Sequence, residues 1–347
     1  MPVKRKVCWR VSQVTLLNSL LTSFRKLGTL LKLAFKAIVY KFYHKLYDES
    51  MATNKKIRKA IISAAGFGTR FLPAVKAFPK ELIPILAKPS LQWLVEEGIQ
   101  AGLDHFLIVH RPDSTEQKKY FTPDTKVENY LKETSKSHYL DSLRAIWQKA
   151  KLDFLPQDPK LPYGNACPIL TAEKWLNGES FVYFFGDDML LEEETGAFLK
   201  NLIQIFEKYQ AAVVAGVQEV PWEEINRYGS VKYAPSGKIP NQVEALLEKL
   251  PADQAPSNMA QFGRFVVAPR VFEALKKQKV GQNNELYFAD VENTLAKSDL
   301  VIAEPVKNGQ WLTTGDPLRW LKANVEYALK DQEINQDLKE YLKSLKI

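Results

Sequence analysis

From Lys56 onward the chain alternates short apolar runs with segments of helical periodicity, and this alternation limits its fold more than any other feature. Parallel strands joined by crossover helices require such an order. The expected strands are 60–64, 105–109, 152–155, 181–185 and 211–217, and the expected helices are 90–101, 166–176 and 196–209. The sequence therefore predicts an α/β fold in which a mostly parallel, mixed sheet is flanked by helices.

Two further helices are expected at the C-terminus, after a region of Pro- and Gly-marked turns. The last helix places four apolar residues on one face: Ile334, Leu338, Leu342 and Leu345. We expect this face to dock on the body of the chain rather than on a partner subunit.

The basic charge of the chain is concentrated in its first 50 residues. The formal net charge is +8, from 48 Lys and Arg against 40 Asp and Glu, and residues 1–50 hold ten of the basic and two of the acidic side chains. Residues 51–347 therefore hold 38 of each and attract no polyanion by net charge. A general role in nucleic-acid binding thereby loses its main support, and no nucleic-acid partner is expected.

Residues 1–50 are interpreted as a basic amphipathic extension. Their longest uncharged run, 11–24, has 14 residues and is too short and too polar to span a bilayer, which needs roughly 20. Three interpretations stay open: a helix with weak membrane-surface contact, a transit-like or docking segment, and an upstream extension ahead of a second start at Met51.

The two cysteines, Cys8 and Cys167, lie far apart, and the four histidines show no metal-ligand spacing. Neither a disulfide framework nor a zinc site is indicated. A cytoplasmic location is expected.

A glycine turn follows the first expected strand, where a nucleotide-binding sheet presents backbone N–H groups to phosphate. The string is AAGFGTR at 64–70. Taken alone, it is also compatible with a simple tight turn. Phe71 and Pro73 follow where a dinucleotide fingerprint needs a small residue and an immediate helix, and no Gly-Lys-Ser/Thr closes the run. An oxidoreductase and a Walker-type nucleotidase are therefore disfavoured.

The loop at 70–82 is stiffened by prolines and brings three cations close to this turn: Arg70, Lys76 and Lys80. The combined string over 64–81 resembles the signature of the sugar-nucleotide pyrophosphorylases, most closely the bacterial UTP–glucose-1-phosphate uridylyltransferases. The resemblance extends over residues 57–332. It implies a Rossmann-like nucleotidyltransferase domain at 51–332 with a smaller sugar-binding part, and a C-terminal helix at 333–347.

For the nucleotide, the resemblance implies a catalytic role for Arg70, Lys80 and Asp187. It also implies that the nucleotide is bound by Ala65, Gly66, Gly68, Thr69, Gln157 and Gly164. The amide of Gln157 would read the uracil edge, since an amide both donates and accepts. Asp187, in the step Gly-Asp-Asp after an apolar strand, is expected to hold Mg²⁺ between phosphate oxygens. Without the resemblance, an Asp pair that caps the next helix is the alternative.

For the sugar phosphate, the resemblance implies binding by Gly229, Glu248 and Lys249. Glu248 would accept from sugar hydroxyls, and Lys249 would hold the phosphate. A Glu-Lys dipeptide alone is usually a surface pair. The strings APSN at 255–258 and FGRF at 262–265 follow the same family pattern.

Three positions depart from this pattern. Asn165 stands where the family has His, Tyr287 where it has Gln, and Thr313 where it commonly has an Asp that helps bind a metal. We expect Mg²⁺ to be held mainly by Asp187 and the phosphates, although altered or weakened activity is the alternative.

The activity implied is transfer of a uridylyl group from UTP to α-D-glucose 1-phosphate, which gives UDP-glucose and pyrophosphate. Thymidylyl transfer on the same fold is one alternative, and a catalytically silent UDP-sugar-binding protein, suggested by Thr313, is another. A homo-oligomer is implied by the resemblance alone.

Overall fold

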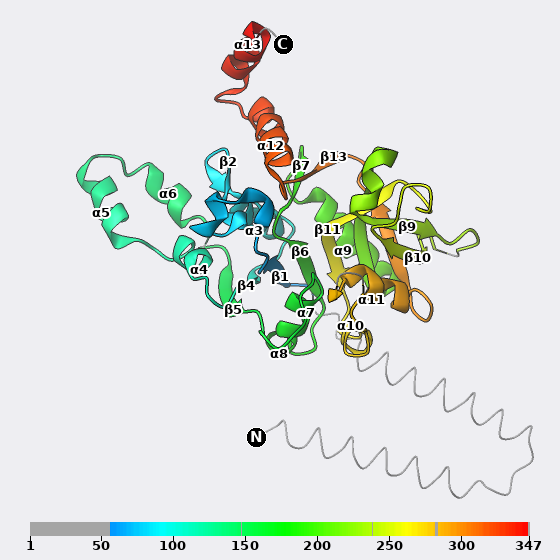
Figure 1. Cartoon of the computed structure of the whole chain (residues 1–347). Coiled ribbons are helices and arrows are strands. Elements are labelled where there is room, and N and C mark those ends of the chain that lie inside the picture. The colour runs from blue at the N-terminus through cyan, green and yellow to red at the C-terminus, as the bar shows by residue number, and fades with distance from the viewer. Residues whose placement is uncertain (1–55, 147, 238, 282–283, 346–347) are drawn as a thin grey trace, which may run out of the picture. The chain divides into compact units, whose positions relative to one another are not determined.

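A nine-stranded mixed sheet forms the centre of the chain (Figure 1). The computed structural model describes residues 56–146, 148–237, 239–281 and 284–345, and residues 57–347 make up one unit. The predicted extension 1–50 lies outside the described residues, so its three interpretations stay predictions.

One half of the sheet is parallel. Its strands, in spatial order, are β5 (Lys151–Pro156), β4 (His105–His110), β1 (Lys59–Ala64) and β6 (Phe181–Phe185). These strands and β8 (Val213–Glu219) correspond to the five expected strands, with ends that differ by two residues at most. The predicted α/β fold with a mixed sheet is confirmed.

The other half is mainly antiparallel. Its central strand is β11 (Met259–Val267), which pairs with β6, β8 and β9 (Gly229–Tyr233). Beyond these strands, β10 (Val243–Glu248) pairs with β9, and β12 (Val301–Pro305) runs parallel to β8. Two small ribbons complete the strands: β2 (Pro84–Ile85) with β3 (Lys88–Pro89), and β7 (Asp188–Glu192) with β13 (Gly309–Thr313).

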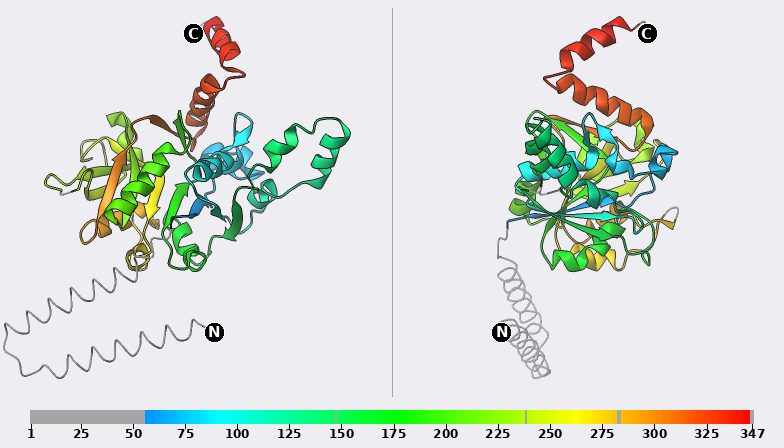
Figure 2. Two further views of the ribbon diagram at one scale, coloured as in Figure 1. Left: turned by 180° about the vertical axis from the view of Figure 1, so that it is seen from behind. Right: turned by 90° about the vertical axis from the view of Figure 1, so that its left-hand side faces the viewer.

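Helices cover both faces of the sheet (Figure 2). The alternation of side chains along the strands gives an apolar core on each face. On one face, α3 (Ser90–Gln100) and α9 (Ala197–Tyr209) pack on Ile62 and its neighbours. On the other face, the residues around Ile61 meet three helices: α7 (Cys167–Thr171), α10 (Val271–Leu275) and α11 (Phe288–Leu295).

The remaining helices lie toward the edges. They are α4 (Glu116–Tyr120), α5 (Thr125–Glu133), α6 (Tyr139–Arg144), α8 (Glu173–Leu176), α12 (Pro317–Lys330) and α13 (Asn335–Ser344). In the part of the chain that the structure describes, none of the helices is both long enough and apolar enough to cross a membrane.

Two expectations about helices need correction. The helix expected at 166–176 is divided at Ala172, because the last turn of α7 tightens until the Ala172 N–H reaches the carbonyls of both Pro168 and Ile169 at 3.1 Å. The apolar face of the last helix does not dock fully on the body, since α13 packs against α12 (Figure 1). Ile334 and Leu345 stay 42% and 40% exposed.

Candidate active site

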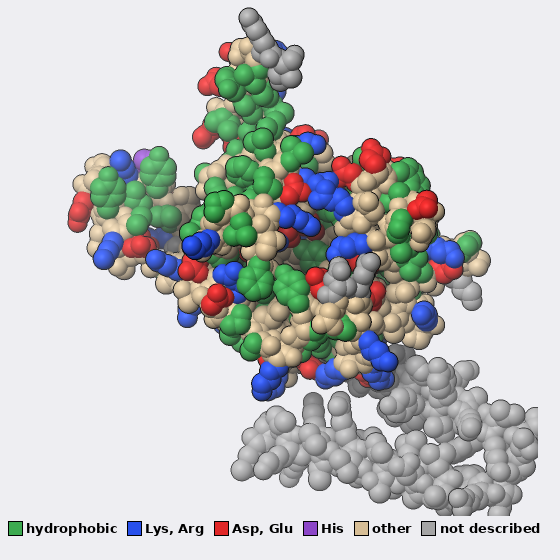
Figure 3. All heavy atoms as spheres, in the orientation of Figure 1, with side chains coloured by type: hydrophobic (Ala, Val, Ile, Leu, Met, Phe, Trp, Pro, Cys, Tyr) green, Lys and Arg blue, Asp and Glu red, His purple; other side chains and the backbone are tan. Residues whose placement is uncertain are grey.

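The carboxyl ends of β1, β5 and β6 face the start of β9 and the end of β10 across a cavity of about 290 Å³. Figure 3 shows this side of the molecule hollowed near its middle, with Lys and Arg side chains around the hollow. Ten of the twelve predicted site residues line the cavity: Ala65, Gly66, Arg70, Lys80, Gln157, Gly164, Asp187, Gly229, Glu248 and Lys249. Segments as far apart in the chain as Ser63 and Thr313 therefore meet here, as expected for the crevice at the strand ends of an α/β sheet.

The two other predicted residues, Gly68 and Thr69, do not line the cavity. Gly68 instead lets Lys80 approach the turn. Its φ is +62°, and a β-carbon added there would lie 3.0 Å from the β-carbon of Lys80. Thr69 is exposed and opens the short turn of helix at Thr69–Phe71.

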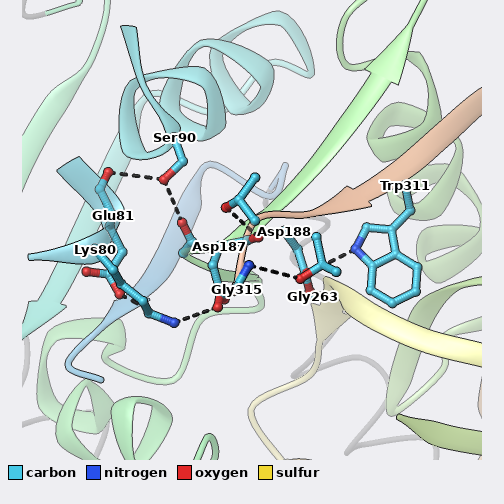
Figure 4. Close-up of polar contacts among 11 residues, drawn as sticks. Lys80, Glu81, Ser90, Asp187, Asp188, Gly263, Trp311 and Gly315 are labelled. Carbon is cyan, nitrogen blue, oxygen red and sulfur yellow. Dashed lines mark hydrogen bonds and ion pairs between the residues drawn. The ribbon is translucent and has the colours of Figure 1, made fainter. Parts of the chain in front are cut away.

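Lys80 and Asp187 form an ion pair in the cavity, with Nζ 2.5 Å from Oδ2 (Figure 4). Burial alone would lower the pKa of Lys80, but the carboxylates of Asp187 and Glu81 outweigh it and raise that pKa. Burial likewise acts to raise the pKa of Asp187, yet Lys80 offsets this and the pKa lies below its ordinary value. Both groups are thus held in their charged forms.

Asp188 links three strands through its hydrogen bonds. Its Oδ1 accepts from the Trp311 Nε1–H at 2.9 Å, and its Oδ2 accepts from the Gly263 N–H at 2.8 Å, so that it joins β7, β11 and β13 (Figure 4). Burial and the nearby charge of Asp187 raise the pKa of Asp188 to about 6. Because Asp188 begins a strand, the alternative in which this Asp pair caps a helix is wrong.

A divalent cation would find the carboxylate of Asp187 here, which is paired with Lys80. A β-carbon placed on Gly315 would lie 3.0 Å from Asp187 Oδ2, 3.5 Å from Thr313 Oγ1 and 3.7 Å from Arg70 Nη1, so these groups face the same space. Among the described residues no three His, Cys, Asp or Glu side chains are grouped to hold a metal ion. Since Mg²⁺ is usually bound by one or two carboxylates together with substrate phosphates, the residues present fit it.

At the opposite end of the cavity, Lys249 follows β10 with a left-handed backbone, at φ +51°. Its Nζ lies 3.5 Å from Glu248 Oε1 and 4.4 Å from the ring centroid of Tyr287, and it donates to the Tyr287 hydroxyl at 3.4 Å. Burial raises the pKa of Glu248. Tyr287, one of the three departures, therefore contacts the lysine predicted to hold the sugar phosphate.

The other departures lie in the same cavity. Asn165 Oδ1 accepts from the Phe288 N–H at 2.7 Å and so fixes the beginning of α11. The preceding Gly164 has φ +139°, and a β-carbon there would come within 2.3 Å of the Leu286 carbonyl oxygen. Only glycine fits between these segments.

Several lining residues were not singled out from the sequence, among them Glu81, Tyr163, Gln261 and Glu285. Glu81 is 1% exposed, its Oε2 has no hydrogen-bond partner among the described residues, and burial raises its pKa to about 7. Of these four residues, Gln261 alone has a signal in the sequence, since it is a polar residue between the apolar residues Ala260 and Phe262.

Comparisons with known proteins identify the family of the chain. The family model described as "Nucleotidyl transferase" matches residues 59–330. A UTP–glucose-1-phosphate uridylyltransferase of Staphylococcus epidermidis is 36% identical over 293 residues, which cover 84% of this chain and all of the relative.

Two solved structures are also similar. One is a UDP-glucose pyrophosphorylase complexed with UDP-glucose, at TM-score 0.69 and 33% identity, with 79% of this chain and 100% of that chain covered. The other is a UTP-bound UDP-glucose pyrophosphorylase of Acinetobacter baumannii, at TM-score 0.73 and 26% identity, with 84% and 100% covered. The chain therefore belongs to the nucleotidyl transferase family, with UTP–glucose-1-phosphate uridylyltransferases among its relatives.

Proposed function

We propose that the chain transfers a uridylyl group from UTP to α-D-glucose 1-phosphate and releases pyrophosphate. The observation that carries this proposal is the arrangement of one cavity with Lys80 and Asp187 at one end and Glu248 and Lys249 at the other. Such a cavity suits two phosphorylated ligands side by side. The relatives' names and the UTP and UDP-glucose complexes support this choice of substrates.

The reaction is an in-line displacement. An oxygen of the sugar phosphate forms a bond to the α-phosphorus of UTP, and the bond from that phosphorus to the oxygen of the departing pyrophosphate breaks. A phosphate monoester has its second pKa near 6 and is already dianionic at neutral pH, so no general base is needed. Catalysis is then positioning and neutralisation of charge.

The side chains divide this work. Lys80 and Arg70 hold the triphosphate and the leaving pyrophosphate, because a fixed cation is most effective in a partly desolvated site. Lys249 brings the second anion against the first. Gln157 and Gly164 hold the uracil, and Glu248 accepts from sugar hydroxyls. Asp187 would hold Mg²⁺, which neutralises charge on the α-phosphate when it is bound.

We further propose a cytoplasmic location. A homo-oligomer and a weak membrane-surface contact through residues 1–50 stay predictions from the sequence.

The test is pyrophosphate release by the purified full chain with Mg²⁺, glucose 1-phosphate and each of UTP, dTTP, CTP, ATP and GTP in turn. We expect a clear preference for UTP. A preference for dTTP would show that the chain transfers a thymidylyl group and not a uridylyl group. No release with any nucleotide, together with measurable UDP-glucose binding, would indicate the catalytically silent protein that Thr313 suggests. Omission of Mg²⁺ in the presence of a chelator is expected to abolish release.

A further inference from the structure

A buried amide and a buried carboxyl group meet beside the sugar end of the cavity. The Nε2 of Gln261, in β11, lies 2.9 and 2.8 Å from the two carboxylate oxygens of Glu292, in α11. Gln261 is 9% exposed and Glu292 is fully buried. This contact joins a strand and a helix, yet Gln261 also lines the cavity and Glu292 does not.

The contact determines how the amide is turned. A carboxylate only accepts hydrogen bonds, so Glu292 takes the NH₂ group and leaves the carbonyl oxygen of Gln261 on the other side. Burial raises the pKa of Glu292 to about 8, and the protonated group would carry an O–H that can donate to the Gln261 carbonyl. The ionised form, present above that pH, is therefore the one that holds the amide in this orientation.

The carbonyl oxygen of Gln261 faces the same space as Glu248. A β-carbon placed on Gly229 would lie 3.6 Å from Oε1 of Gln261 and 3.2 Å from Oε2 of Glu248. Gly229 lines the cavity at that point. Two acceptor oxygens, from neighbouring parts of the sheet, are therefore presented together where the hexose is expected.

We propose that Gln261 is a specificity-determining residue for the sugar, and that Glu292 is a positioning residue that holds its carbonyl oxygen toward the cavity. With Glu248, Gln261 forms a wall made only of acceptors, which requires a sugar that donates from a free hydroxyl group at this place. A sugar without that hydroxyl leaves the buried carbonyl oxygen of Gln261 unpaired and is rejected. This inference rests on the proposed function, since it concerns the sugar end of the same cavity.

A purely structural role would not require this pair. A strand and a helix can be joined by apolar side chains of similar volume without the cost of burying a carboxylate. If apolar side chains replaced Gln261 and Glu292, the strand and the helix would still be joined, but no carbonyl oxygen would be directed toward the cavity.

The test is calorimetric binding of UDP-glucose and of each of its monodeoxy analogues to the full chain and to two variants, at a pH above 8 where Glu292 is ionised. In Gln261→Met the carbonyl oxygen is removed at similar volume. In Glu292→Gln the new amide can donate, so Gln261 is no longer held in one orientation. For the parent, we expect one analogue to bind about tenfold more weakly than UDP-glucose, the loss of about one hydrogen bond. Both variants are expected to bring this ratio close to one while the dissociation constant of UTP stays unchanged.

Gln218→Met is the matched control, because Gln218 also holds a neighbouring element through its amide, at Trp311, but lies outside the cavity. It is expected to keep the ratio of the parent. The inference is overturned if Gln261→Met and Glu292→Gln keep that ratio, or if they weaken UDP-glucose and every analogue equally. Because binding is measured, the result does not depend on turnover, and a chain that binds selectively without releasing pyrophosphate would contradict the proposed function alone.

Discussion

Lys80 forms ion pairs with two carboxyl groups. Its Nζ lies 2.5 Å from Asp187 Oδ2 and 3.9 Å from Glu81 Oε1, and the side chain is mostly buried. Lys80→Ala and Asp187→Ala are each expected to lower turnover about 10²-fold or more, the usual effect of removing one preorganised electrostatic group. Steady-state pyrophosphate release measures this.

Lys76→Ala is the control for Lys80→Ala. Lys76 belongs to the same proline-stiffened loop but is exposed and does not line the cavity. Its removal is expected to change turnover less than threefold or so, since an exposed charge is well screened. Turnover of Lys80→Ala within the range of this control would remove Lys80 from the mechanism. A thermal melt of each variant separates this outcome from misfolding.

Single residues were predictable from the sequence where a local string carried them. The loop at 64–81 contains Gly66, Arg70 and Lys80 within one short segment, and all three line the cavity. The contact between Gln261 and Glu292 was not predictable in this way, because it depends on how β11 packs against α11, 31 residues later. The close approach of Lys80 to Gly68 was not predictable either, because it depends on how the loop folds back on itself.

At the scale of elements, the helix α3 is fastened to the central strand β11 by a buried ion pair. Arg264 is fully buried, and its Nε and Nη2 each donate to Glu97 at 2.7 Å. Glu97→Ala would leave the guanidinium buried without a counter-charge, so the free energy of unfolding is expected to fall by about 3–5 kcal/mol. Urea denaturation followed by circular dichroism measures this.

The neighbouring Glu96 offers a matched control. It pairs with Lys88 at 2.8 Å at the surface, and Glu96→Ala is expected to cost about 1 kcal/mol or less. Replacing both buried partners, in Glu97→Leu with Arg264→Met, is expected to regain most of the loss. If Glu97→Ala were no more destabilising than Glu96→Ala, the ion pair would not fasten α3 to β11.

Elements with a simple periodicity were predictable, and those without it were not. The parallel strands β1, β4 and β6 are short apolar runs and were found within two residues. The antiparallel β11 is buried along almost its whole length and carries Gln261 and Arg264 among apolar residues. A strand with polar groups buried in the core shows neither a continuous apolar run nor alternation. The sequence pattern therefore did not predict β11 as a strand.

Over the whole molecule, charge is divided unevenly along the chain. Residues 1–50 hold ten of the Lys and Arg residues and two of the Asp and Glu residues, whereas residues 51–347 are balanced. Basic residues near an anionic bilayer contribute about 1 kcal/mol each. The full chain is therefore expected to sediment with vesicles that contain anionic lipid, and the chain from Met51 is expected to stay in solution.

Raised salt should release the full chain, because exposed charges are screened within roughly 10 Å at 0.1 M ionic strength, and vesicles of zwitterionic lipid alone serve as the control. Equal sedimentation of both versions would place the contact in the balanced part of the chain. No sedimentation of either would remove the membrane-surface interpretation and leave the docking and upstream-extension interpretations. Pyrophosphate release by both versions completes the argument: if turnover is equal in solution, residues 1–50 affect where the reaction occurs and not the chemistry in the cavity.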